Sequence, residues 1–185
     1  MSIGVKLADI ITSPFKAGIL TAPMIWQMQS EGKLSIDPWE INNLTSDSYN
    51  LHLHHHMKRL TNDLDMRSDD TYEDLFILED GLFLEPTECY LASTIEVIGT
   101  RYFPADVSGV TGVARKFLSI AQSSHDVHMG FTGQLTLEIT VQRRLKVYPG
   151  MRIAQIRFFT PVGDIVVMPS SYVGQMGPTL SKGIE

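Results

Sequence analysis

The sequence predicts a mainly β domain, folded as a sandwich or a distorted jelly-roll barrel with short helices. Two observations support this class. From residue 75 onward, short segments with apolar alternation follow one another closely, and Gly or Pro lies in the gaps between them. Closely spaced strands bounded by such turn residues are typical of β-sandwiches and barrels. The length of 185 residues and the hydrophobic content of 43% suit one domain with a sizeable core.

The first part of the chain shows fewer regular patterns. Residues 1–23 mix apolar and polar residues with Pro and Gly, so we expect an N-terminal extension before a single domain over 24–185. A short helix is expected over 24–31, because Gly follows it. An alternating strand is expected at 49–53, and the charged residues 58–74 are expected to form an exposed loop.

The second part contains the strand pattern. The expected strands cover residues 75–80, 81–99, 130–141, 151–160 and 164–168. One helix is expected among them, over 113–121, because apolar residues such as Val113 and Phe117 recur there at helical spacing. Thr111 and Gly112 precede this helix as cap and loop residues would.

The stretch GFTGQLTLEIT, residues 130–140, carries a candidate for chemistry. One side of this strand holds Phe131, Leu135, Leu137 and Ile139. The other side holds Thr132, Gln134, Thr136, Glu138 and Thr140. Glu138 is the one carboxylate on the polar side. The strand alone fits either a solvated Glu138 or a Glu138 that faces a pocket.

A second candidate is the start of the helix predicted at 113–121. Free N–H groups at a helix N-terminus attract anions. Arg115 lies in the first turn, where it is either a solvated side chain or a bidentate phosphate ligand.

Composition excludes several classes of protein. The net charge of −6 argues against a nucleic-acid binder, and no run of about 20 apolar residues predicts a membrane span. The N-terminus lacks the pattern of a secretory signal, and the single cysteine, Cys89, allows no internal disulfide, so we expect a cytoplasmic protein. One cysteine also cannot build the zinc site of the zinc-dependent nucleobase deaminases.

Six segments in order resemble the dCTP deaminases of the dUTPase-like superfamily. They are GKLSIDPWEINNLTSDSYNLHL, similar to G-x-L-x-I-x-P…S-Y-D-L-x-L; DGLFLEPTECYLASTIEVI, with its T-x-E; SGVTGVARKFL, similar in part to G-R-S-S-L-A-R-x-G-L; GFTGQLTLEI; YPGMRIAQIRFF; and YVGQMGPTLSK. Together they span about residues 31 to 182. The resemblance therefore implies a dUTPase-like β-barrel that assembles as a homotrimer.

The resemblance also implies an activity, the hydrolytic deamination of dCTP to dUTP and ammonia without zinc. Glu138 matches the family's general base. Magnesium is expected to accompany the triphosphate rather than take part in deamination. A C-terminal tail, about 170–185, is expected to close over the site of a neighbouring subunit.

The family's other functional positions are carried over one at a time. Catalytic roles are expected for Glu138, Arg115 and Thr111. Nucleotide binding is expected for Thr111, Gly112, Arg115, Ser124, Thr136, Leu137, Gln155, Tyr172, Gln175 and Lys182.

This chain departs from the family pattern at several positions. Val110 replaces the basic residue of the loop, Gly112 lacks a phosphate-binding hydroxyl, and Phe117 replaces a glycine. His128 stands where the family has an Asp that contacts the sugar. Asp126 lies two residues earlier, about 7 Å away along a strand, so the two positions are not assumed equivalent.

These departures leave two other functional readings open. One is dUTP diphosphatase, or a bifunctional dCTP deaminase and dUTPase; His128 counts against both. The other is a catalytically inactive nucleotide-binding regulator, which the altered VTGVAR loop favours.

The histidines of HLHHH raise a separate hypothesis of metal binding. His52, His54 and His56 are expected on one strand face. We expect solvated or interface histidines there, and no metal site.

Overall fold

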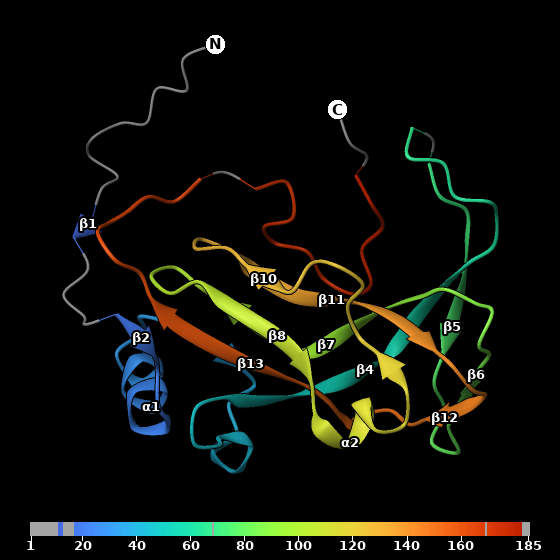
Figure 1. The fold of residues 1–185 in the computed structure, drawn as a ribbon, viewed down its shortest axis with the longest axis horizontal. Helices are drawn as coiled ribbons and strands as arrows, with labels where there is room; N and C mark the ends of the chain where they lie inside the picture. The colour runs from blue at the N-terminus through green and yellow to red at the C-terminus, as the bar shows by residue number, and fades with distance from the viewer. Residues whose placement is uncertain (1–10, 13–16, 68, 169, 183–185) are drawn as a thin grey trace.

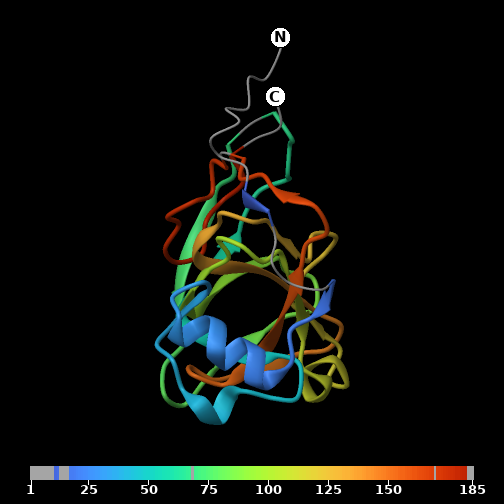
Figure 2. The same cartoon turned by 90° about the vertical axis from the view of Figure 1, so that its left-hand side faces the viewer.

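The computed structural model describes residues 11–12, 17–67, 69–168 and 170–182. It confirms the predicted mainly β fold class, with 42% of the described residues in strands and 10% in helices. The main sheet has ten strands and curls into a half-barrel. Figures 1 and 2 show its curl, and in Figure 1 α1 lies at the lower left while the C-terminal tail crosses the top. No helix of the described residues is long and apolar enough to cross a membrane.

The elements of the first half are β1 (Ile11–Thr12), β2 (Gly18–Ile19), α1 (Ala22–Ser30), β3 (Ser35–Asp37), the 3-10 turn η2 (Ile41–Asn43), β4 (Tyr49–Leu60), β5 (Tyr72–Phe76), β6 (Leu82–Leu84) and β7 (Tyr90–Gly99). Those of the second half are β8 (Ala105–Gly109), α2 (Thr111–Ala114), β9 (Leu118–Ser119), β10 (Asp126–Val127), β11 (Thr132–Val141), β12 (Leu145–Val147), β13 (Arg152–Thr160) and β14 (Asp164–Ile165).

The sheet runs in the order β10-β8-β13-β4-β7-β11-β9, and all the pairs are antiparallel. β2, β3 and β5 join it at β13, β7 and β4. The long strands supply the core, because every second residue points inward and is apolar, as with Leu51 and Leu53 in β4 or Leu137 and Ile139 in β11. The predicted alternation of GFTGQLTLEIT is therefore confirmed on its apolar side.

The N-terminal helix agrees with its prediction to within two residues. α1 begins next to Pro23, where the missing N–H costs no hydrogen bond, and it buries Ile25 and Met28 against the sheet. Of the expected extension 1–23, part lies outside the described residues. The described part pairs with the domain, since β2 lies beside β13 and Leu20 is buried.

Two sequence-based predictions are wrong. The helix expected over 113–121 is only the four-residue α2, because Phe117 has a left-handed backbone and the chain continues as β9. The exposed loop expected over 58–74 is shorter. Strand β4 extends to Leu60 and pairs with β5 from Tyr72, so the charged side chains line a hairpin edge.

Phe117 is strained where the family pattern has glycine. Its φ is 58°, a region that costs a residue with a Cβ about 1–2 kcal/mol, and the residue is 64% exposed. We expect Phe117→Gly to raise the free energy of unfolding by about 0.5–1 kcal/mol, because the flexibility that glycine adds to the unfolded chain offsets part of the relief. Phe117→Ala, which removes the ring but keeps the Cβ, should give no such gain in a urea titration. Equal gains would mean that the exposed ring, and not the backbone, is the cause.

Candidate active site

Glu138 is held in place by the loop that follows β9. The backbone N–H of Gln122 donates to Glu138 Oε2 at 2.9 Å, and the backbone N–H of Glu138 donates to the carbonyl of Ile120 at 2.9 Å. The side-chain amide of Gln122 adds bonds to the Glu138 carbonyl and to Thr140 Oγ1. These contacts fix the carboxylate relative to the loop on which Ser124 lies.

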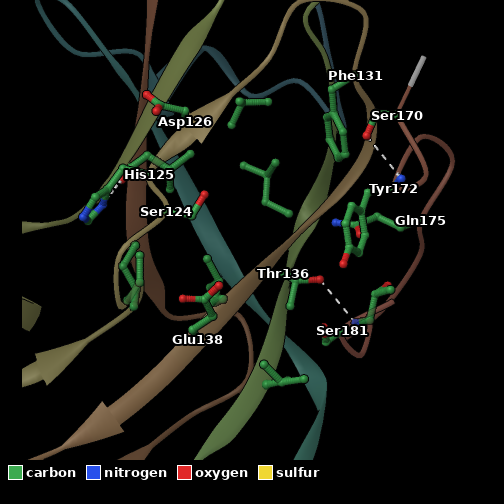
Figure 3. A pocket seen from close by; sticks show the side chains of 18 of the residues that line it. Ser124, His125, Asp126, Phe131, Thr136, Glu138, Ser170, Tyr172, Gln175 and Ser181 are labelled. Carbon is green, nitrogen blue, oxygen red and sulfur yellow. Dashed lines mark hydrogen bonds between the residues drawn. The ribbon is translucent and has the colours of Figure 1, made fainter. Parts of the chain in front are cut away.

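This carboxylate faces a pocket of about 540 Å³, called the Glu138 pocket here. Its walls are β11 at Leu135–Glu138, the loop and strand at 120–131, and tail residues between 170 and 181. Figure 3 shows Glu138 and Ser124 on one side, Tyr172 and Gln175 on the other, and Thr136 between them. The strand pattern left Glu138 undecided between solvent and a pocket, and the structure places it at a pocket.

The C-terminal tail lies along β11 and closes one side of this pocket. Gly174 N–H donates to the Thr132 carbonyl at 2.6 Å, and Gly177 N–H donates to Gln134 Oε1 at 2.6 Å. The Gln175 side-chain amide donates to the Gln134 carbonyl at 2.8 Å, and Thr179 N–H donates to Thr136 Oγ1 at 3.2 Å. The tail thus covers the site of its own chain, while its expected reach to a neighbouring subunit stays a prediction.

The loop around α2 borders a second concavity of about 670 Å³, called the loop hollow here. It is formed by residues 110–113 and 116, by β12 and the residues that follow it, and by the start of β13. Thr111, Gly112 and Gln155 line it. Gln155 is held by Ser108 Oγ at 3.2 Å and by Ser48 Oγ at 3.4 Å, at the floor of the hollow.

The predicted site residues therefore fall into two groups. Ser124, Thr136, Leu137, Glu138, Tyr172 and Gln175 line the Glu138 pocket, and Thr111, Gly112 and Gln155 line the loop hollow. No described residue lines both. Arg115 lines neither, and the ammonium of Lys182 is turned to the Ser171 carbonyl. One chain thus does not bring Glu138 together with Thr111 and Arg115, and their shared catalytic role stays a prediction.

The histidines of β4 do not converge. His52 Nδ1 binds Glu96 at 2.6 Å and His56 Nε2 binds Asp74 at 2.7 Å. Burial, together with its two neighbouring histidines, lowers the pKa of His54, while hydrogen bonds from Lys58 and His56 lower the pKa of Asp74. Among the described residues no three His, Cys, Asp or Glu side chains form a metal-sized group.

Sequence reasoning missed the residue that anchors the tail. Gln134 was placed on the polar side of the strand, yet it is only 6% exposed because the tail covers it. Its amide also donates to the Ile95 carbonyl at 3.1 Å. The sequence offered one signal for this contact: Gln134 is an uncharged amide, which can bind backbone groups, and the C-terminal tail is rich in glycine.

A model of the family described as dCTP deaminase-like matches residues 19–161. The chain belongs to the dCTP deaminase-like family. A protein of Leptospira biflexa named "dCTP deaminase, dUMP-forming" is 37% identical over 135 residues, which cover 71% of this chain and 76% of the relative. A protein of Cytophaga hutchinsonii with the same name is 35% identical over 129 residues, covering 69% of this chain and 75% of the relative.

A solved structure supports the fold. The crystal structure of 2'-deoxycytidine 5'-triphosphate deaminase from Agrobacterium tumefaciens matches with a TM-score of 0.64 and 21% identity. The match covers 80% of this chain and 49% of that chain, so this chain spans about half the length of that protein. At this identity the likeness concerns the fold alone.

The dCTP deaminase-like family has an Asp where this chain has His128, and the structure shows where His128 and the nearby Asp126 lie. Both side chains line the Glu138 pocket, on the loop-and-strand wall (Figure 3 shows Asp126). Their separation along the chain therefore does not keep the Asp126 carboxylate out of the pocket.

Proposed function

We propose that this protein deaminates the cytosine of dCTP hydrolytically, to dUTP and ammonia, without zinc. The observation that carries the proposal is the Glu138 carboxylate, oriented by the Gln122 N–H at the wall of a pocket of about 540 Å³, in a chain of the dCTP deaminase-like family. The loop carrying Ser124 and the tail carrying Tyr172 and Gln175 complete the walls, and Thr136 and Leu137 supply backbone groups beside the base.

The chemistry needs one base that later acts as an acid. A water adds to C4 of the cytosine ring and forms a carbon–oxygen bond, while Glu138 takes a proton from it. The same carboxyl passes this proton to N3, then takes the remaining proton from the new hydroxyl at C4 and gives it to the amine. The carbon–nitrogen bond breaks and ammonia leaves. A positioned carboxylate contributes about 10²–10⁴-fold to such a step.

A homotrimer would complete this site. The Glu138 pocket and the loop hollow share no lining residue, and Figures 1 and 2 place the tail and α2 on opposite sides of the chain. A second copy that presents its Thr111–Arg115 loop to the Glu138 pocket would bring base and phosphate contacts together. Sedimentation should then give the mass of three chains.

Magnesium fits this proposal only as a companion of the nucleotide. The described residues that line the loop hollow include no carboxylate, so they form no magnesium site of their own. The ion would bind the triphosphate oxygens and reduce their charge. We also place the protein in the cytoplasm, where deoxynucleotides are made.

The experiment is a product assay. The purified protein is incubated with dCTP, dCMP and dUTP plus magnesium, and ammonia, pyrophosphate and nucleotide are followed together. Formation of dUTP and ammonia from dCTP supports the proposal. Failure to release ammonia from any of them overturns it and favours a nucleotide-binding regulator.

A second candidate is the dUMP-forming reaction, in which pyrophosphate is also released. Two observations favour it: the similar proteins of Leptospira biflexa and Cytophaga hutchinsonii are named dUMP-forming, and Asp126 adds a carboxylate to the Glu138 pocket. His128, in the place of the family's Asp, counts against it. Pyrophosphate released from dCTP in the same assay would decide for this candidate.

The phosphate loop provides a further test. An added Cβ at Gly112 meets nothing within 4 Å, so Gly112→Ser fits without rearrangement. We expect this variant to tighten dCTP binding about tenfold, since one added hydrogen bond to a charged group contributes about 1.5 kcal/mol. Titration calorimetry measures it. Gly112→Ala changes the backbone in the same way without the hydroxyl, and a gain of equal size there would contradict the proposed contact.

A further inference from the structure

The loop hollow is strongly cationic. Lys116, Lys146 and Arg152 line it, from three separate segments of the chain, and no described lining residue is acidic. Lys146 is half-buried, whereas Lys116 and Arg152 are exposed. In a protein with a net charge of −6, such a concentration of positive charge in one hollow attracts anionic ligands.

These cations are not used inside the chain. Neither Lys116 nor Arg152 forms an ion pair or side-chain hydrogen bond with a described residue. Lys146 lies over the rings of Phe83 and Tyr148, at 5.2 and 5.8 Å, and also lacks an ion-pair partner among the described residues. By contrast, the nearby Arg144 pairs with Glu85 at 2.8 Å and does not line the hollow.

An asparagine at the wall of the hollow points to the same conclusion. Asn50 lines the hollow, is only 5% exposed, and forms no side-chain hydrogen bond with a described residue. Its amide therefore keeps its donors and its acceptor available to a ligand or a water in the hollow. Asn50 stands where the pattern S-Y-D-L has an Asp, so this chain has lost a negative charge in the hollow.

We propose that Lys116, Lys146 and Arg152, together with Asn50, form a polyphosphate-binding subsite that replaces the basic loop residue missing at Val110. The inference rests on the proposed function and its assembly, because the ligand is the triphosphate of a nucleotide whose base lies at Glu138 of a neighbouring copy. Three cations from three segments supply the charge that one loop arginine would supply, and Thr111 and the open space at Gly112 lie beside them.

The test uses inorganic tripolyphosphate and dCTP as probes, by titration calorimetry on the full chain. We expect Lys146→Gln and Arg152→Gln each to weaken binding of both probes about five- to tenfold, with a shallower dependence on salt. Binding of dCMP, which has one phosphate, should change less. Arg152→Lys keeps the charge and should bind tripolyphosphate nearly as the wild type does.

Arg144→Gln is the matched control, because it removes one positive charge close by without altering the hollow. Thermal unfolding of each variant verifies folding. If the hollow variants bind tripolyphosphate as Arg144→Gln does, or if the wild type does not bind it, the subsite is wrong.

Failure of the subsite can be told apart from failure of the proposed function. Deamination of dCTP by the wild type, with unchanged KM in the Lys146 and Arg152 variants, would keep the function and reject the subsite. Specific tripolyphosphate binding without any release of ammonia would keep the subsite and reject the function.

Discussion

Glu138→Gln is expected to reduce the rate of ammonia release from dCTP by about 10³-fold or more while the dissociation constant for dCTP changes by less than about threefold. The amide has nearly the shape of the carboxylate, and its oxygen can still accept the Gln122 N–H that lies 2.9 Å from Glu138 Oε2. It cannot take a proton from water. The variant thus removes the proton transfer and leaves the pocket walls in place.

Two measurements separate catalysis from binding. Ammonia release is followed at saturating dCTP, and dCTP binding is measured by calorimetry on the same sample. Glu79→Gln is the control, because Glu79 is exposed on the turn before β6 and lies outside the Glu138 pocket. Its activity should equal that of the wild type.

The outcome decides between roles for Glu138. Normal ammonia release by Glu138→Gln would remove Glu138 from the mechanism and leave Asp126 and Asp70, the other carboxylates that line the pocket, as candidate bases. Loss of both activity and dCTP binding would show that the carboxylate holds the loop at Gln122 rather than the reacting water.

The sequence predicted best where local periodicity decides the structure. GFTGQLTLEIT alternates because one face of β11 packs into the core, and Glu138 could be assigned to the other face from spacing alone. The short helix α1 was equally accessible, because Pro23 and Gly32 mark its ends.

The parts that failed depend on contacts between distant segments. Gln134 reads as a solvent-facing residue until the tail, some forty positions later, covers it. The apolar residues at 113–121 do have helical spacing, yet no helix of that length forms. Backbone pairing of Leu118 with Val141 competes with that helix and wins, and it requires the left-handed turn at Phe117. The predicted site residues lie in two separate concavities, and this division also depends on tertiary packing that no local sequence pattern encodes.

The T-x-E segment of β7 shows a motif whose physical role emerges only from the structure. Regular pairing with β7 is interrupted in both neighbouring strands. β11 shifts register between Gln134 and Thr136, and β4 shifts between Leu53 and Met57 and has no β7 partner before Leu53. Thr94 Oγ1 accepts the Leu135 N–H at 3.0 Å, and Glu96 Oε2 accepts the His52 N–H at 2.9 Å. These two side chains take the place of missing ladder partners.

Glu96→Ala is accordingly expected to lower the free energy of unfolding by about 3 kcal/mol. Glu96 is 2% exposed, and its carboxylate accepts both the backbone N–H of His52 and His52 Nδ1, the latter at 2.6 Å. Alanine leaves the His52 N–H without its acceptor, removes the partner of the half-buried His52 ring, and opens a cavity. Urea unfolding at fixed protein concentration measures the change, since assembly would make the apparent stability depend on concentration.

Glu96→Gln keeps the volume of the side chain and one acceptor but removes the negative charge, so it shows how much of the loss comes from the charge. The amide oxygen can still accept the His52 N–H, so we expect a loss of only about 1 kcal/mol. Glu79→Ala, an exposed carboxylate, should change the stability by less than about 0.5 kcal/mol. Equal losses for the alanine and glutamine variants at Glu96 would mean that the charge of the carboxylate stabilises β4, and a negligible loss for both would mean that β4 keeps its irregular register without Glu96.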